Sequence, residues 1–163
     1  MYKLPLIISI ALLLLAAPQN TNVQKTELKN IAETLIGRDS VKPYYLLVDS
    51  IDHFKTKTKK LDGVRYTIAS DEVVNAGLWT NEIFEKAHII SKNYLDSVVK
   101  ANRRMEPPAH YRFSLPYFSS DKKSFIIYYN YYCGSLCAEY SLRLYKKVKG
   151  KWTFIKNFFL MVS

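Results

Sequence analysis

The sequence predicts an α+β fold, in which a twisted antiparallel sheet packs against one long helix and a shorter N-terminal helix. Residues 124–163 carry the clearest signal, because runs of β-branched and aromatic residues alternate there with two turns, at 133–137 and 148–151. These runs predict a C-terminal three-stranded meander. Two earlier segments, residues 22–38 and 80–102, instead space their apolar residues as helices do.

The first twenty residues predict an export signal. A short basic start precedes an apolar run at residues 4–17. A membrane-spanning helix needs about 20 apolar residues, so this shorter run is typical of the apolar core of a signal peptide. We therefore predict a signal peptide at residues 1–20, a single α+β domain at residues 21–163, and a periplasmic or secreted location. Under the alternative, an uncleaved segment would be the chain's one contact with a membrane.

The first half of the domain predicts a helix followed by a hairpin. The helix at 22–38 has Leu28, Ile31 and Leu35 on one face, and Gly37 provides its end. We then expect a strand at 44–48 to pair with a strand at 64–68, because Asp62 and Gly63 form a hairpin signal before the second strand. This N-terminal hairpin would join the sheet of the meander.

The long helix is predicted from Thr80 or Asn81 to about Asn102. Its expected buried face is made of apolar residues at helical spacing: Ile83, Ala87, Ile90, Tyr94 and Val98. Pro107 and Pro108 stop the helix. Residues 111–118 then look extended. In the second strand of the meander, Tyr140, Leu142 and Leu144 share one face, and the wet face carries Glu139, Ser141, Arg143 and Tyr145.

Cys133 and Cys137 are the chain's two cysteines. In an exported protein an even pair is most simply a disulfide, and a three-residue loop brings its flanking positions within disulfide reach. Closing so short a loop stabilises by only about 2 kcal/mol, so its expected use is to fix the hairpin register. Two alternatives stay open: redox pairs usually have two intervening residues, and two thiolates are half of a zinc site.

The net charge of +10 favours anionic partners in general. The basic residues that could form an anion-binding surface fall into three clusters, and lysines at sheet ends also serve to prevent edge-to-edge aggregation. An exported location argues against nucleic acid as the partner. The three clusters are Lys55, Lys57, Lys59 and Lys60; Lys100, Arg103 and Arg104; and Lys146, Lys147, Lys149 and Lys151.

The C-terminal third resembles a group of small exported proteins of Gram-negative bacteria. The segments that carry the resemblance are Y-Y-C-G-S-L-C at 131–137 and L-Y-K-K-V-K-G-K-W at 144–152. Those proteins share a C-G-x-x-C hairpin followed by a G-K-W strand. The same strands are similar to the last strands of NTF2-like, or cystatin-like, domains. That likeness implies a curved sheet around a helix with a pocket between them, and it implies no particular activity.

These features favour a non-catalytic role. The sequence has no Gly-rich phosphate loop, no H-E-x-x-H and no G-x-S-x-G, so no catalytic residue, metal or cofactor is predicted. We expect an exported binding or interaction module whose partner is an anionic surface or another exported protein. Two alternatives remain: an NTF2-like pocket protein that binds or transforms a small molecule, and a basic surface that binds an anionic glycan, lipid or polymer.

Overall fold

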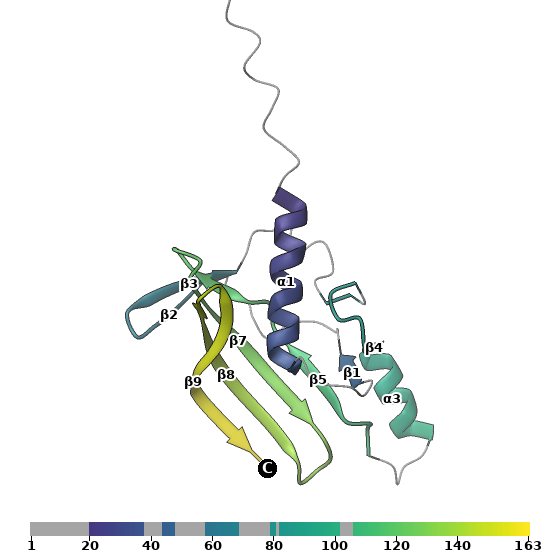
Figure 1. Cartoon of the computed structure of the whole chain (residues 1–163). Helices are drawn as coiled ribbons and strands as arrows, with labels where there is room; N and C mark the ends of the chain where they lie inside the picture. The colour runs from purple at the N-terminus through teal and green to yellow at the C-terminus, as the bar shows by residue number, and fades with distance from the viewer. Residues whose placement is uncertain (1–19, 38–43, 48–57, 69–78, 81, 102–105) are drawn as a thin grey trace, which may run out of the picture.

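The computed structural model describes residues 20–37, 44–47, 58–68, 79–80, 82–101 and 106–163. These residues form a mixed α+β fold with a twisted sheet of nine strands and two helices, which confirms the predicted α+β class but not the purely antiparallel sheet. The meander is the longest part of the sheet (Figure 1). Its strands are β7 (Ser124–Tyr132), β8 (Ala138–Val148) and β9 (Lys151–Val162).

The sheet forks at β7. One side of β7 pairs with β8 over its whole length, while its other side pairs with β6 (Tyr117–Ser119) at its start and with β5 (His110–Phe113) at its end. Ser114 bridges the break between those two short strands: its N–H donates to the Tyr128 carbonyl, and its hydroxyl accepts from the Tyr128 N–H. The fork gives the sheet two wings.

Each wing ends in short strands. Beyond β6 lie β3 (Val64–Ile68) and β2 (Thr58–Leu61), joined by the predicted turn at Asp62 and Gly63, both of which have positive φ. Beyond β5 lie β1 (Tyr44–Leu47) and β4 (Ala87–Ile90), and β1 runs parallel to both of its neighbours. The sheet is therefore mixed, and the expected pairing of 44–48 with 64–68 is wrong.

The predicted long helix is the second correction. Residues 87–90 form β4, and only Lys92–Ala101 is helical, as α3. The apolar spacing of this segment fits a helix, but Leu46 of β1 is fully buried, and β1 gains a parallel partner through β4. Tertiary context has overridden the local periodicity. The inward residues of this region, Leu47, Ile90 and Leu95, form a small cluster of their own.

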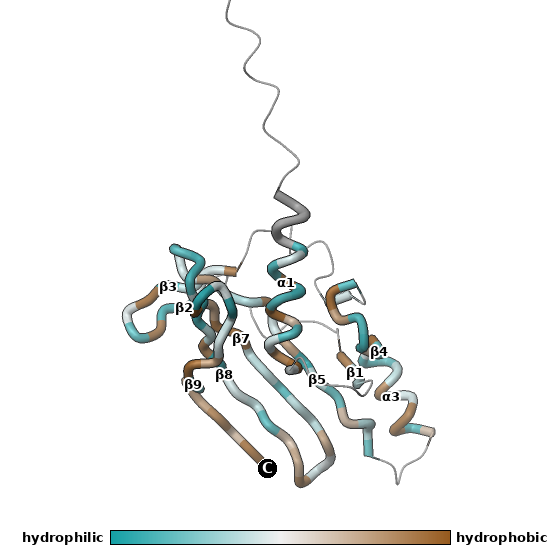
Figure 2. The backbone as a smooth tube through the Cα atoms, in the orientation of Figure 1, coloured by the Kyte–Doolittle hydropathy of each residue, from teal (hydrophilic) through white to brown (hydrophobic). Residues whose placement is uncertain are grey.

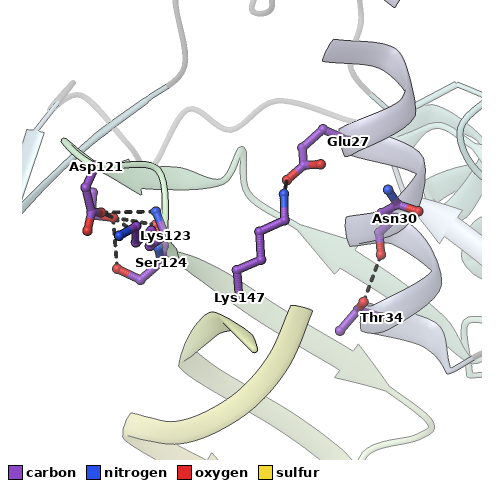
Figure 3. Close-up of polar contacts among 8 residues, drawn as sticks. Glu27, Asn30, Thr34, Asp121, Lys123, Ser124 and Lys147 are labelled. Carbon is purple, nitrogen blue, oxygen red and sulfur yellow. Dashed lines mark hydrogen bonds and ion pairs between the residues drawn. The ribbon is translucent and has the colours of Figure 1, made fainter. Parts of the chain in front are cut away.

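Helix α1 (Asn20–Ile36) agrees with its prediction and covers one face of the sheet, which we call the helix face (Figure 1). Leu28, Ile31, Ala32 and Leu35 are buried at helical spacing against the inward side chains of β5, β7 and β8. Gly37, with φ of 84°, ends the helix. An ion pair between Lys147 and Glu27, with 2.8 Å between Nζ and Oε1, ties β8 to this helix (Figure 3).

The opposite face of the sheet has its own core. The wing of β2, β3 and β6 turns toward β8 and β9, so that its two tyrosines pack against leucines of β8. The tip of that wing is held by an ion pair between Asp62 and Lys156 of β9. The buried members of this cluster are Tyr66, Tyr117, Ile126, Leu142 and Leu144.

Candidate functional site

The candidate site is a groove of about 610 Å³ on the helix face, beside the outer part of the meander. One wall is Thr34 of α1, whose hydroxyl donates to the Asn30 carbonyl at 2.8 Å (Figure 3). The floor and far wall come from residues of β8 and β9. These lining residues are Glu139, Arg143, Tyr145, Trp152, Thr153, Phe154, Asn157, Leu160 and Val162.

A polar network lies along β8 at the floor of the groove. Alternate residues of a strand share a face, so Glu139, Ser141, Arg143 and Tyr145 point the same way. The Arg143 guanidinium donates to Glu139 Oε1 at 2.6 Å and to Ser141 Oγ at 3.1 Å, and Ser141 Oγ donates to the same Glu139 oxygen at 2.8 Å. Two opposite charges are thereby neutralised in a partly buried place.

Arg143 also lies against aromatic rings. Its guanidinium carbon is 3.3 Å from the centroid of Tyr129 and 5.9 Å from that of Phe154. Burial lowers the pKa of Arg143, but its hydrogen bonds with Glu139 and Tyr145 outweigh burial, and the pKa is raised overall. For the Tyr129 and Tyr145 phenols, burial raises the pKa, and the interaction with Arg143 offsets only part of that rise. Arg143 therefore stays charged and its aromatic neighbours stay neutral at physiological pH.

A bulge in β9 places Asn157 in the groove. Tyr145 pairs with Phe154, and unbroken alternation from there would set Lys156 opposite Arg143. The register shift between Leu144 and Tyr145 brings Asn157 opposite Arg143 instead and turns Lys156 to the other face, and a second shift follows between Leu142 and Arg143. Like charges directly across two strands are destabilising, and bulges commonly re-aim side chains at functional sites. The first of these bulges thus replaces a cation with an amide beside Arg143.

Two buried polar atoms of the groove wall have no hydrogen-bond partner among the described residues: Asn157 Oδ1 and Trp152 Nε1. Trp152 is 7% exposed, and its ring lies under the Lys147 ammonium. A buried polar group without a partner costs about 1–3 kcal/mol, and such groups are rare in native proteins. The wall of the groove therefore holds one buried donor and one buried acceptor next to an ion pair, each covered by neighbouring atoms.

A second hollow, of about 320 Å³, lies between the end of α1, Tyr44 and the 83–86 segment. Burial raises the pKa of Tyr44 to about 12. The charged residues that line this hollow include Lys29 and Glu85, which form an ion pair with each other. Within the described ranges, no three His, Cys, Asp or Glu side chains stand together as metal ligands, and no helix is long and apolar enough to span a membrane.

The predicted disulfide is present. Cys133 and Cys137 are bonded, with 5.0 Å between their Cα atoms, at the turn between β7 and β8. Glu106 anchors this turn: its carboxylate accepts from Ser135 Oγ at 2.6 Å and from the Ser135 N–H at 3.2 Å. Gly134 is required there, because its φ is 127° and an added Cβ would lie 2.6 Å from Glu106 Oε2. The hairpin register is thus fixed from two sides.

The three predicted basic clusters do not form one surface among the described residues. Lys55, Lys57, Arg103 and Arg104 lie outside those residues. Lys59 and Lys60 are on β2 in one wing, while Lys100 is on α3 beside the other wing (Figure 1). The third cluster stays together at the turn between β8 and β9, where Lys146, Lys149 and Lys151 are exposed. Its fourth member, Lys147, is paired with Glu27.

Sequence reasoning placed Arg143 and Glu139 on the wet face of their strand but did not identify them as a site. Trp152 was noted only as the end of the G-K-W segment and not as a site residue. Asn157 was not singled out, because the bulge that orients it follows from register and not from composition. Comparisons with protein-family models, with curated proteins and with solved structures found no match to this chain.

Proposed function

We propose that this protein is an exported binding module whose ligand site is the groove between α1 and the outer strands of the meander. The observation that carries the proposal is the pair of unpartnered polar atoms, Trp152 Nε1 and Asn157 Oδ1, in the wall of a groove large enough for a small ligand. A ligand with one acceptor and one donor would complete both hydrogen bonds. Because both atoms are covered, a lining side chain must turn aside on binding.

The charges of the groove favour an uncharged, polar ligand. Arg143 and Glu139 already neutralise each other, so a charged ligand would have to compete with that bond. Phe154 and Leu160, which are 47% and 51% exposed, offer apolar contact beside the polar atoms. This chemistry suits a molecule with hydroxyl or amide groups on an apolar frame. A small-molecule ligand of this kind is also what the alternative prediction of a pocket protein requires.

The test of the site uses Asn157→Leu. Amide spectra of the purified protein would be screened against neutral polar compounds, with the Trp152 indole N–H as reporter and Trp152→Phe to assign it. We expect Asn157→Leu to weaken binding at least about tenfold while leaving stability unchanged or higher, because it removes an unpaired buried acceptor. Asn130→Leu on β7 faces away from the groove and serves as the matched control. Normal binding by Asn157→Leu, or its clear destabilisation, would refute the site.

Export is proposed from the apolar run at residues 4–17 and is supported by the disulfide, because disulfides persist in oxidising compartments. The test is expression of the full chain in a Gram-negative host, followed by fractionation and mass measurement. We expect a periplasmic or secreted product whose N-terminus falls between Ala16 and Asn20. An uncleaved, reduced product in the cytoplasm would count against export.

A second candidate function is binding of an anionic polymer by the basic turns. The Lys147 N–H donates to the Lys123 carbonyl at 2.9 Å, so the exposed Lys122 and Lys123 lie next to the turn that carries Lys149 and Lys151. If these lysines bind heparin-like polymers, affinity should fall steeply with salt, and Lys149→Gln with Lys151→Gln should reduce the slope by about two. A salt-independent interaction would contradict this function.

A further inference from the structure

The edges of the sheet differ in how they are protected. Among the described residues the sheet ends at three strands, β2, β4 and β9. β2 and β4 have four residues each, and β2 carries Lys59 and Lys60. β9 has twelve residues and pairs only with β8. Natural proteins shorten or charge their free edges to prevent unwanted pairing, so β2 and β4 follow the rule and β9 departs from it.

The C-terminal half of β9 is also uncharged and apolar. Residues 157–162 contain no charged side chain, and Leu160, Met161 and Val162 are 51%, 59% and 73% exposed. Lys156, the nearest charged residue along β9, is held by Asp62 and lies over the Phe158 ring. Figure 2 shows this contrast, with hydrophobic colour along β9 toward the C-terminus and hydrophilic colour at the turn between β8 and β9. A long, apolar, unpaired edge is a site at which another strand adds.

We propose that β9 pairs in antiparallel orientation with β9 of a second copy of this chain, centred on Leu160, to form a two-fold dimer. In this register Leu160 lies opposite Leu160 of the partner subunit on the helix face. Phe159 lies opposite Met161 of the partner subunit on the other face, which is a favourable sulfur–aromatic pair. Every rung between residues 158 and 162 joins two apolar side chains, so the segment complements itself.

The distribution of charge supports a second copy as the occupant. An uncharged edge selects an uncharged strand, although the chain as a whole carries +10. In antiparallel pairing, the lysine-rich turns of the two copies point to opposite ends. At about 3.3 Å per residue, each turn lies about 30 Å from Leu160. This distance is far beyond the Debye length of about 8 Å, so the lysines of the two copies repel each other little. The pairing is isologous and uses the one edge among the described strands that lacks protection, so assembly stops at two.

Analytical ultracentrifugation of the purified full-length protein tests the dimer. Between about 1 μM and about 100 μM we expect a dimer that dissociates on dilution. Met161→Lys places a cation opposite Phe159 of the partner subunit and should weaken the dimer at least about tenfold, without touching the groove lining. Ile155→Lys, on the same strand but outside the paired segment, is the matched control and should remain dimeric.

Hydrogen exchange provides the second readout. Amides of residues 158–162 that face outward should be protected in the dimer and should lose protection in Met161→Lys, while the β7–β8 ladder keeps its protection. The native spectrum of Met161→Lys confirms that it is folded. A monomer at all these concentrations overturns the proposal and leaves the edge to a strand of another polypeptide. Equal disruption by Ile155→Lys and Met161→Lys also overturns it. Leu160 and Val162 belong to both the paired segment and the groove lining, whereas Met161 and Ile155 are not in that lining. Binding is therefore measured in Met161→Lys as well, so that the two proposals fail or survive separately.

Discussion

Strands β8 and β9 present two different surfaces. On the face opposite α1, Leu142 and Leu144 pack against Ile126 and Tyr117, and all four are 5% exposed or less. On the helix face, Glu139, Arg143 and Tyr145 of β8 line the groove, and Glu139 and Arg143 form its ion pair. The sheet alternates its side chains, so one pair of strands has a filled face that stabilises the fold and an open face suited to binding. Stability and binding should therefore respond to different residues of the same strand.

The largest expected effect comes from the filled face. Leu144→Ala removes a side chain that is 5% exposed and leaves a cavity, so it should lower the free energy of unfolding by about 2–4 kcal/mol. The folded fraction should keep its groove and bind normally. Urea titration gives the stability, and ligand titration at low temperature gives the binding. A loss of less than about 1 kcal/mol would mean that this face is less well packed than the structure indicates.

The sequence predicted the parts of this fold that are local. Helix α1 follows from the spacing of Leu28, Ile31 and Leu35. The meander and its turns follow from β-rich runs interrupted by residues that accept positive φ, such as Lys149 and Gly150. In these segments the partner of each strand is its neighbour in the chain. Local pattern and final pairing therefore agree.

Nonlocal pairing could not be predicted in this way. Ala87 and Ile90 have helical spacing, yet they belong to a strand whose partner, β1, lies about forty residues earlier in the chain. The candidate site likewise depends on how strands pair and not on local sequence pattern. Asn157 and not Lys156 faces Arg143 because of a bulge, and neither bulge of β9 has a glycine or proline to mark it. Unbroken alternation along β9 would have placed Lys156 opposite Arg143.

The second prediction concerns the end shared by both faces. Replacing Cys133 and Cys137 with Ala opens the short loop that closes the β7–β8 hairpin, and should cost about 2 kcal/mol of stability in the chain-entropy model. Thermal unfolding of the oxidised protein and of the double variant measures the difference. The groove reaches this end through Glu139, but Asn157 and Trp152 pair with Arg143 and Lys147 farther along β8, so binding should change little. A loss of binding as large as that in Asn157→Leu would show that the hairpin end and the groove are coupled.

The third prediction addresses the polar network of the groove. Arg143→Met leaves the Glu139 carboxylate without its charged partner in a partly buried place, and should cost about 1–2 kcal/mol. Glu139→Gln in the same chain should recover part of that loss, because the remaining group is neutral. A double-mutant cycle from urea titrations gives the coupling energy of the pair. Strict additivity of the two single variants would mean that the ion pair contributes nothing, and the contrast between the faces would then rest on packing alone.

The smallest expected effect is a local response to pH at the disulfide hairpin. Hydrogen bonds from Ser135 Oγ and then from the Ser135 N–H hold the pKa of Glu106 below its ordinary value. Because the folded-state pKa is the lower one, the anchoring is fully present above the ordinary glutamate pKa of about 4.3, and it is lost as the pH falls through the folded-state pKa. The Ser135 amide resonance should therefore stay constant down to about pH 4 and then shift. Glu106→Gln removes the titration, so its Ser135 resonance should be flat across the same range. A shift of equal size in that variant would assign the response to another group, whereas a response confined to the hairpin would show that neither face of β8 and β9 depends on this anchor.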